Sequence, residues 1–150
     1  MNSEEARAAL DSVRETDRKM AEKMHWPFYR HALFGGAEGA IVAGLGMSQG
    51  GGTAVMGVGV VMLLALMLGD RKRDGMFVSG MKGKRTRPLM IFIMAVLLAA
   101  LGVSLLVLRE REGVDMLALA LGGAVTVVLT LASMRWEKLY RAELREGTAL

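Results

Sequence analysis

The chain has 150 residues, of which 53% are hydrophobic, and a formal net charge of +4 at pH 7. It contains no cysteine, which excludes disulfides, thiolate catalysis and cysteine-ligated zinc sites. Although 23% of the residues are charged, the mean hydropathy is +0.36, because the charges lie outside long apolar segments.

Residues 1–27 are densely charged and predict a cytoplasmic amphipathic helix that ends before Pro27, since the residue preceding a proline avoids the helical region. Apolar residues recur there at helical spacing, at Ala6, Leu10, Val13, Met20 and Met24. The stripe is thin and interrupted by Asp17, and acidic and basic residues nearly balance. We therefore favour docking against the cytoplasmic loop or pairing with another chain over lying on the membrane surface.

Four segments are long enough to cross a bilayer, namely residues 28–47, 53–69, 88–108 and 114–134. A helix rises about 1.5 Å per residue, so roughly 20 apolar residues cross a hydrocarbon core about 30 Å thick. The last three segments are free of Asp, Glu, Lys and Arg over nearly their whole length. The first carries charged residues and five glycines, which indicates a weaker, internally packed span.

The predicted fold is therefore an all-α membrane protein with four transmembrane helices in two antiparallel hairpins. Residues 28–134 form this single transmembrane domain, and a tight turn at 48–52 closes the first hairpin. A basic cytoplasmic loop at 70–87 joins the hairpins, and residues 135–150 form a cytoplasmic tail. The charged N-terminal segment lacks the apolar core of a signal peptide, so the first span is expected to serve as the insertion signal.

Lysine and arginine predict the orientation of this domain. Six of them precede residue 31, seven lie in the loop 70–87 and four follow residue 134, whereas only two lie on the other side. By the positive-inside rule, both termini and the basic loop are cytoplasmic. The residues expected at the interfacial aromatic belt fall at the same ends, and they are Trp26, Tyr29, Trp136 and Tyr140. The expected location is a bacterial-type cytoplasmic (inner) membrane.

The basic loop also bears on partners. Each Lys or Arg near a membrane surface is attracted to anionic headgroups by about 1 kcal/mol. No nucleic-acid-binding fold or interleaved aromatic pattern accompanies the basic clusters. We expect contacts with anionic lipid headgroups at 70–87 and no nucleic-acid partner.

Glu38 lies about 15 Å into the first span, close to the bilayer midplane. A charged residue there costs about 2.5–3.5 kcal/mol on insertion scales, so it must face protein or water, be paired, or be protonated. His31 lies seven residues earlier on nearly the same face, and Arg30 is further round the helix. Glu38, His31 and Arg30 form the candidate intramembrane polar site. Its alternatives are a proton-coupled or cation-binding carboxylate and a neutral Glu in an interhelical hydrogen bond.

Small residues predict close helix packing. Gly35 and Gly39 form a GxxxG pair, Gly44 extends that surface, and Gly122 lies in a similar pattern in the last span. The pattern leaves open whether the contacts form within one chain or between copies. A homo-oligomer or a larger membrane complex are both compatible with it.

No catalytic motif is recognisable in the sequence. We find no intramembrane Ser/His pair, no HExxH, no nucleophile elbow, no phosphate-binding loop and no metal-ligand cluster. We therefore expect no enzymatic activity and predict no catalytic residues, no cofactor-binding residues, no metal site and no cofactor.

Two functions remain as hypotheses. The first is a structural, regulatory or accessory subunit acting through helix packing and tail contacts. The second is a small proton-coupled or cation transporter or channel using Glu38. A lone acid in the first of four spans resembles the arrangement of small multidrug-resistance transporters. The chain departs from that family in its long charged N-terminal segment and in having only Phe34 and Phe92 as aromatics away from the span ends. Its one-sided Lys and Arg distribution also disfavours a dual-orientation dimer.

Overall fold

The computed structural model describes residues 3–23, 25–47, 51–74, 83–109 and 115–146. These residues form five α-helices and one π-helical segment. The elements are α1 (Ser3–Lys23), α2 (Phe28–Gly46), α3 (Gly51–Asp74), α4 (Thr86–Val103), η1 (Ser104–Leu108) and α5 (Asp115–Glu146). The predicted turn at 48–52 and the basic loop 70–87 each fall partly outside the described residues, and Met24 also lies outside them.

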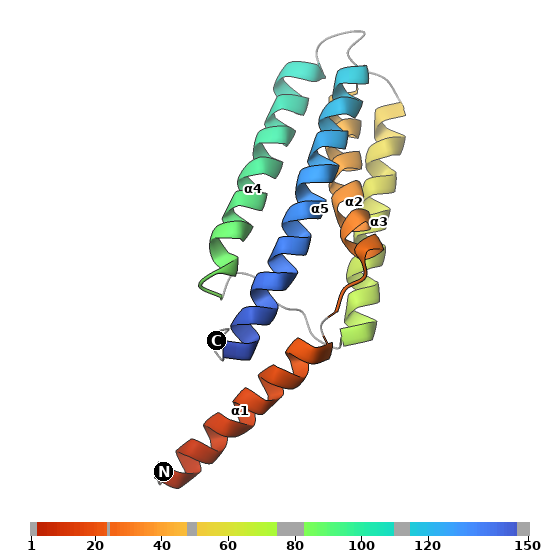
Figure 1. The fold of residues 1–150 in the computed structure, drawn as a ribbon. Helices are drawn as coiled ribbons and strands as arrows, with labels where there is room; N and C mark the ends of the chain where they lie inside the picture. The colour runs from red at the N-terminus through yellow and green to blue at the C-terminus, as the bar shows by residue number, and fades with distance from the viewer. Residues whose placement is uncertain (1–2, 24, 48–50, 75–82, 110–114, 147–150) are drawn as a thin grey trace.

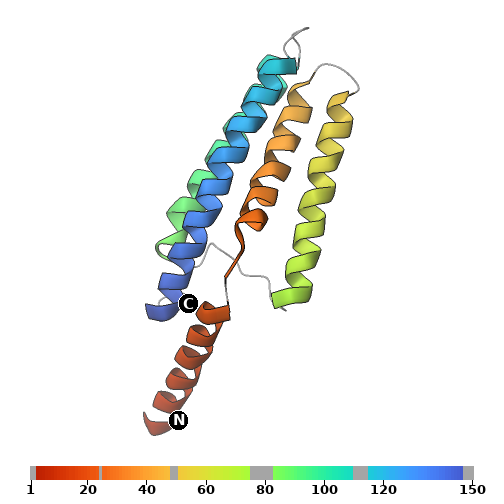
Figure 2. The ribbon, with the colours of Figure 1, turned by 45° about the vertical axis from the view of Figure 1, so that its right-hand side comes forward.

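Helices α2 to α5 run side by side as an elongated bundle, and consecutive helices are antiparallel (Figure 1). Helix α2 lies between α3 and α5, and contacts both along its length (Figure 2). Helix α4 packs mainly on α5, while α3 contacts only α2 among the described helices. The bundle is thus organised around α2 and α5, with α3 and α4 at its edges.

Three helical segments are long and apolar enough to cross a membrane: Gly51–Lys72, Thr86–Leu108 and Asp115–Glu146. This confirms a helical protein with three candidate membrane spans. Helix α2 is not among them, because Arg30, His31, Glu38 and its glycines lower its hydropathy. Large apolar side chains on the outer faces are exposed, such as Val61 at 65% and Leu106 at 78%. Such continuous apolar surfaces suit contact with lipid rather than water.

Two helices extend beyond the predicted spans. Helix α3 continues to Asp74, and α5 continues to Glu146 within the segment predicted as a tail. With 32 residues, α5 is about 48 Å long, which exceeds a hydrocarbon core of about 30 Å. Its last turns therefore extend past the apolar part of the bundle, where they contact α1 and the start of α4.

The contacts of α2 depend on small residues. A Cβ at Gly122 would lie 2.5 Å from the Gly39 carbonyl oxygen, and one at Gly35 would lie 2.5 Å from the Thr126 carbonyl oxygen. On the α3 side, a Cβ at Gly44 would lie 2.5 Å from the Gly52 carbonyl oxygen. Real Cβ atoms do not approach so closely, so these glycines let the backbones of α2, α3 and α5 pack within one chain.

The apolar core lies on the α4 side of this contact. It comprises Val42 of α2, Ile93 and Ala100 of α4, and Val125, Leu129 and Ala132 of α5. At the top of the core, the buried Ser104 hydroxyl of η1 donates a hydrogen bond of 2.8 Å to the Val42 carbonyl oxygen. This bond satisfies a polar group that would otherwise be buried among apolar side chains.

Helix α1 projects from one end of the bundle (Figures 1 and 2). Of its residues 4–22, only Asp17 and Ala21 are buried, and Ala21 packs with Trp136, Tyr140 and Leu144 of α5. Leu10 and Val13, on the predicted apolar stripe, are exposed at 59% and 41%. Exposed ion pairs such as Lys19–Glu15, at 2.7 Å, stabilise the helix. The hydrogen bond that Lys19 donates to Glu15 lowers the pKa of the Glu15 carboxyl.

We predict that Gly39→Val destabilises the bundle whereas Gly36→Val does not. The new side chain at residue 39 would collide with the Thr126 hydroxyl and the Gly122 carbonyl, whereas a Cβ at Gly36 meets no atom within 4 Å. Overpacking of this kind costs about 1–3 kcal/mol. Denaturant titration of both variants in detergent micelles measures the difference, and equal stabilities would contradict the described α2–α5 contact.

Candidate functional site

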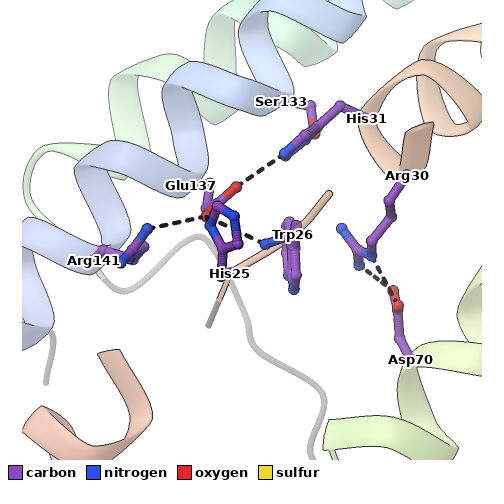
Figure 3. Close-up of polar contacts among 8 residues, drawn as sticks. All are labelled: His25, Trp26, Arg30, His31, Asp70, Ser133, Glu137 and Arg141. Carbon is purple, nitrogen blue, oxygen red and sulfur yellow. Dashed lines mark hydrogen bonds and ion pairs between the residues drawn. The ribbon is translucent and has the colours of Figure 1, made fainter. Parts of the chain in front are cut away.

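A buried polar network lies where the start of α2 meets α5 (Figure 3). His31 of α2 is only 2% exposed. Its Nδ1 lies 2.8 Å from Ser133 Oγ and its Nε2 lies 2.9 Å from Glu137 Oε2, both on α5. Ser133 and Glu137 are four residues apart, so one face of α5 presents both to the imidazole.

The hydrogen-bond partners of His31 determine which ring nitrogen carries the hydrogen. An ionised carboxylate only accepts hydrogen bonds, so Nε2 carries the hydrogen donated to Glu137. In the neutral ring, Nδ1 then accepts the Ser133 hydroxyl hydrogen, and both ring nitrogens are satisfied. The two side chains can thus be buried without leaving an unsatisfied ring nitrogen on His31 or an unsatisfied Oε2 on Glu137.

Glu137 is the centre of this network. Its Oε1 accepts a hydrogen bond of 3.4 Å from the Trp26 backbone N–H and lies 3.5 Å from Nη1 of Arg141. The same oxygen lies 3.8 Å from Nδ1 of His25. One side chain, itself buried, therefore ties the segment before α2 and the first turn of α2 to α5.

Arg30 forms a second polar link, between α2 and α3. Its Nε donates to Asp70 Oδ1 at 2.9 Å, and its Nη2 donates to Asp70 Oδ2. The guanidinium carbon lies 3.4 Å from the centroid of the Trp26 ring, in a cation–π contact. Figure 3 shows Arg30 between Trp26 and Asp70, pointing away from the His31 network.

Aromatic stacking joins these links. The rings of Trp26 and Trp136 are stacked with centroids 5.6 Å apart, and those of Trp136 and Tyr140 with centroids 5.0 Å apart. Trp136 and Tyr140 are buried, whereas Tyr29 is largely exposed. Of the four residues predicted at the membrane interface, Trp26, Trp136 and Tyr140 thus stack on one another inside the protein, and only Tyr29 points outward.

A third polar contact holds the start of α4. Glu143 of α5 is 1% exposed; it accepts a 3.1 Å hydrogen bond from the Thr86 hydroxyl and another from the Arg85 backbone N–H. A carboxylate beside the first turn of a helix satisfies free N–H groups and is favoured by the helix dipole. Arg85 also pairs with Glu146 at 2.9 Å. The last turns of α5 therefore fix the position of α4.

The structure does not bring the three predicted polar residues of α2 into one site. His31 bonds to α5, Arg30 bonds to α3, and Glu38 is half-buried with no hydrogen bond or ion pair to any described residue. Glu38 lies seven residues, or about 10 Å along the helix, beyond His31. It is thus a separate feature from the network around Glu137.

The sequence showed no recognisable Ser/His pair, but the structure brings Ser133 and His31 within hydrogen-bond distance of each other. The arrangement nevertheless lacks two requirements of a serine hydrolase. Ser133 is buried, and its backbone N–H lies inside α5, where it bonds within the helix and cannot serve an oxyanion. Among the described residues, no group of three His, Asp or Glu side chains is placed to hold a metal ion.

Sequence reasoning missed Ser133, Glu137, Asp70 and Glu143. The spacing of Ser133 and Glu137 places them on one helix face near the interface, which was a usable signal for a partner of His31. Asp70 lies at the end of a span, at the same predicted depth as Arg30. The role of Glu143 carried no such signal, because it depends on the extension of α5 beyond the apolar segment.

Comparisons with protein-family models, curated proteins and solved structures find no match to this chain.

We predict that Glu137→Ala strongly destabilises the protein, because it leaves His31 and the Trp26 N–H buried without an acceptor. Leaving a buried donor without its acceptor costs about 1–3 kcal/mol for each group. Glu146→Ala is the matched control, since it breaks the Arg85–Glu146 ion pair, in which both side chains are about half exposed. Such an exposed ion pair contributes at most about 1 kcal/mol to stability. Denaturant unfolding in micelles compares them, and similar losses would refute the central role of Glu137.

Proposed function

We propose that the chain is a four-span integral membrane protein that acts as a structural, regulatory or accessory subunit of a membrane complex. In this proposal α2 crosses the bilayer together with α3, α4 and α5. Its contacts with α3 and α5 support this, because Asp70 and Glu137 provide partners for Arg30 and His31. Such pairing lowers the cost of placing polar residues in a span.

One observation carries the proposed role. Helix α1 contacts α5 only near its end, and its outer part presents Leu10 and Val13 on an exposed surface. The polar groups around His31 and Glu137, in contrast, are occupied by contacts within the chain. This arrangement suits a protein in which α1 recognises a partner and the bundle of α2 to α5 anchors the chain in the membrane.

The orientation proposed from Lys and Arg has both termini and the basic loop in the cytoplasm. The ends of α2 and α3 that carry Arg30 and Asp70 lie at the same end of the bundle as the Arg85–Glu146 pair and α1 (Figures 1 and 3). Most basic residues are thus gathered at one end, as the positive-inside rule requires.

Labelling of single cysteines tests both orientation and the crossing of α2, since the native chain has no cysteine. We predict that a cysteine replacing Gly51 is modified by an impermeant thiol reagent from outside, whereas cysteines replacing Arg18 or Lys84 are modified only after permeabilisation. If α2 does not cross, Arg18→Cys and Gly51→Cys will be modified from the same side.

The subunit role predicts a partner that depends on α1. Leu10→Asp with Val13→Asp places charges on the exposed apolar positions and should reduce the recovery of a co-purifying membrane protein about tenfold, a loss of about 1.4 kcal/mol in binding. Ala8→Asp with Ser12→Asp changes exposed residues on the opposite face of α1 and should leave recovery unchanged. Affinity purification in mild detergent compares them, and equal recovery would contradict the proposal.

A specific observation favours the second candidate, a proton-coupled or cation transporter or channel. Glu38 is half-buried within α2 and makes no hydrogen bond or ion pair in the described part of the chain. A carboxylate at that depth is a candidate proton or cation site. Under this alternative, Glu38→Gln abolishes a pH-dependent ion flux in proteoliposomes, whereas Glu22→Gln on α1 preserves it. Absence of any flux in the wild type favours the subunit role.

A further inference from the structure

A groove of about 340 Å³ lies between the first turns of α2 and the last turns of α3. Leu33 of α2, and Met62, Ala65 and Leu66 of α3, form its apolar wall. Arg30 and Asp70 lie toward the end of the bundle and supply its polar groups. Its volume falls at the lower end of the range of about 300–1,000 Å³ seen for small-ligand sites.

The polar end is built to receive a phosphate. Two nitrogens of Arg30 are held by Asp70 and the guanidinium rests on the Trp26 ring, so its orientation is fixed before any ligand binds. Its Nη1 donates no hydrogen bond to a described residue. A planar guanidinium with remaining donors recognises phosphate oxygens well, and preorganisation lowers the entropic cost of binding.

The charge around the groove also favours an anionic group. Asp70 neutralises Arg30, but the next two residues of α3, Arg71 and Lys72, are both basic and exposed. These two residues lie outside the groove lining, so they add positive charge at the end of α3 next to the groove, while the groove itself holds the paired Arg30 and Asp70. Basic pockets between transmembrane helices on the cytoplasmic side are typical sites for lipid headgroups.

The apolar wall runs away from this charged end, toward the middle of the bundle. The part of the wall on α3 belongs to Gly51–Lys72, which is long and apolar enough to cross a membrane. Helix α3 is covered only by α2 in the described structure, so the groove opens on the side of α3 that faces the surroundings of the bundle. In a bilayer these surroundings are acyl chains lying roughly along the helices.

We propose that this groove binds one phospholipid, with its phosphate on Arg30 and one acyl chain between α2 and α3. The site rests on the proposed crossing of α2 as a transmembrane helix. The bound lipid fills the space beside a helix that has a single protein neighbour, and it links the interfacial Arg30–Asp70 pair to the apolar wall. The ligand is thus a structural phospholipid and not a free phosphate.

Two glycines of α3 provide a matched test. A Cβ at Gly69, which lines the groove, or at Gly57, which does not, meets no atom within 4 Å. Both Gly→Leu variants should therefore fold, but only Gly69→Leu occupies the mouth of the groove. Native mass spectrometry of the detergent-purified protein, incubated with phosphatidylglycerol, should show one retained lipid for the wild type and Gly57→Leu. Gly69→Leu should retain about tenfold less.

Retention of the lipid by a folded Gly69→Leu variant, or equal loss from both variants, overturns the site. If Gly69→Leu does not fold, Ala65→Phe replaces it, with Ala54→Phe as the control on an exposed position outside the groove. The role of phosphate is tested with diacylglycerol, which has the same acyl chains without the phosphate. The wild type should bind it about tenfold more weakly than phosphatidylglycerol, and equal binding refutes the contact with Arg30.

The cysteine labelling described above reports separately on whether α2 crosses the membrane. If the cysteines are labelled as predicted but the lipid-binding differences described above are absent, only the lipid site is rejected. A labelling pattern in which α2 does not cross rejects the four-span arrangement on which the site rests.

Discussion

The buried contact of His31 with Ser133 and Glu137 is the constraint on which the rest of the structure depends. An apolar environment does not tolerate an unsatisfied imidazole or carboxylate, so the two helices must meet in a single register. The same register brings Gly39 against Gly122 and lets the backbones approach closely. Polar pairing thus specifies which surfaces meet, and the small residues make that meeting sterically possible.

Arg30 and His31 of α2 therefore serve a structural purpose before any other. Among the described bundle helices, α2 alone lacks a segment long and apolar enough to be a candidate span, yet it lies between α3 and α5, where Asp70 and Glu137 provide partners for Arg30 and His31. The more apolar α3 and α4 occupy the edges and expose continuous apolar surface. This is the reverse of a water-soluble bundle, because lipid accepts apolar side chains while only protein partners accept polar ones.

The two ends of the molecule differ in what they offer to other molecules. The end that carries α1 combines basic residues, a projecting helix and the groove beside Arg30. The buried network at the same end is occupied internally and rigidifies the base from which α1 projects. Recognition is accordingly proposed at the exposed surface of α1 and at the groove, and the network provides the fixed geometry that both require.

The amino-acid sequence by itself determined the helical class, the three strongly apolar spans and the end at which the basic residues gather, because these follow from segment length and local composition. It also singled out Arg30, His31 and Glu38 as polar residues needing an explanation. Only the tertiary structure decided that His31 bonds to Glu137, that Arg30 bonds to Asp70 and that Glu38 stands apart. Such partners lie 40 or 106 residues away in the chain. Helical periodicity describes the faces of one helix, and which two faces meet depends on packing and on the pairing of buried polar groups across helices.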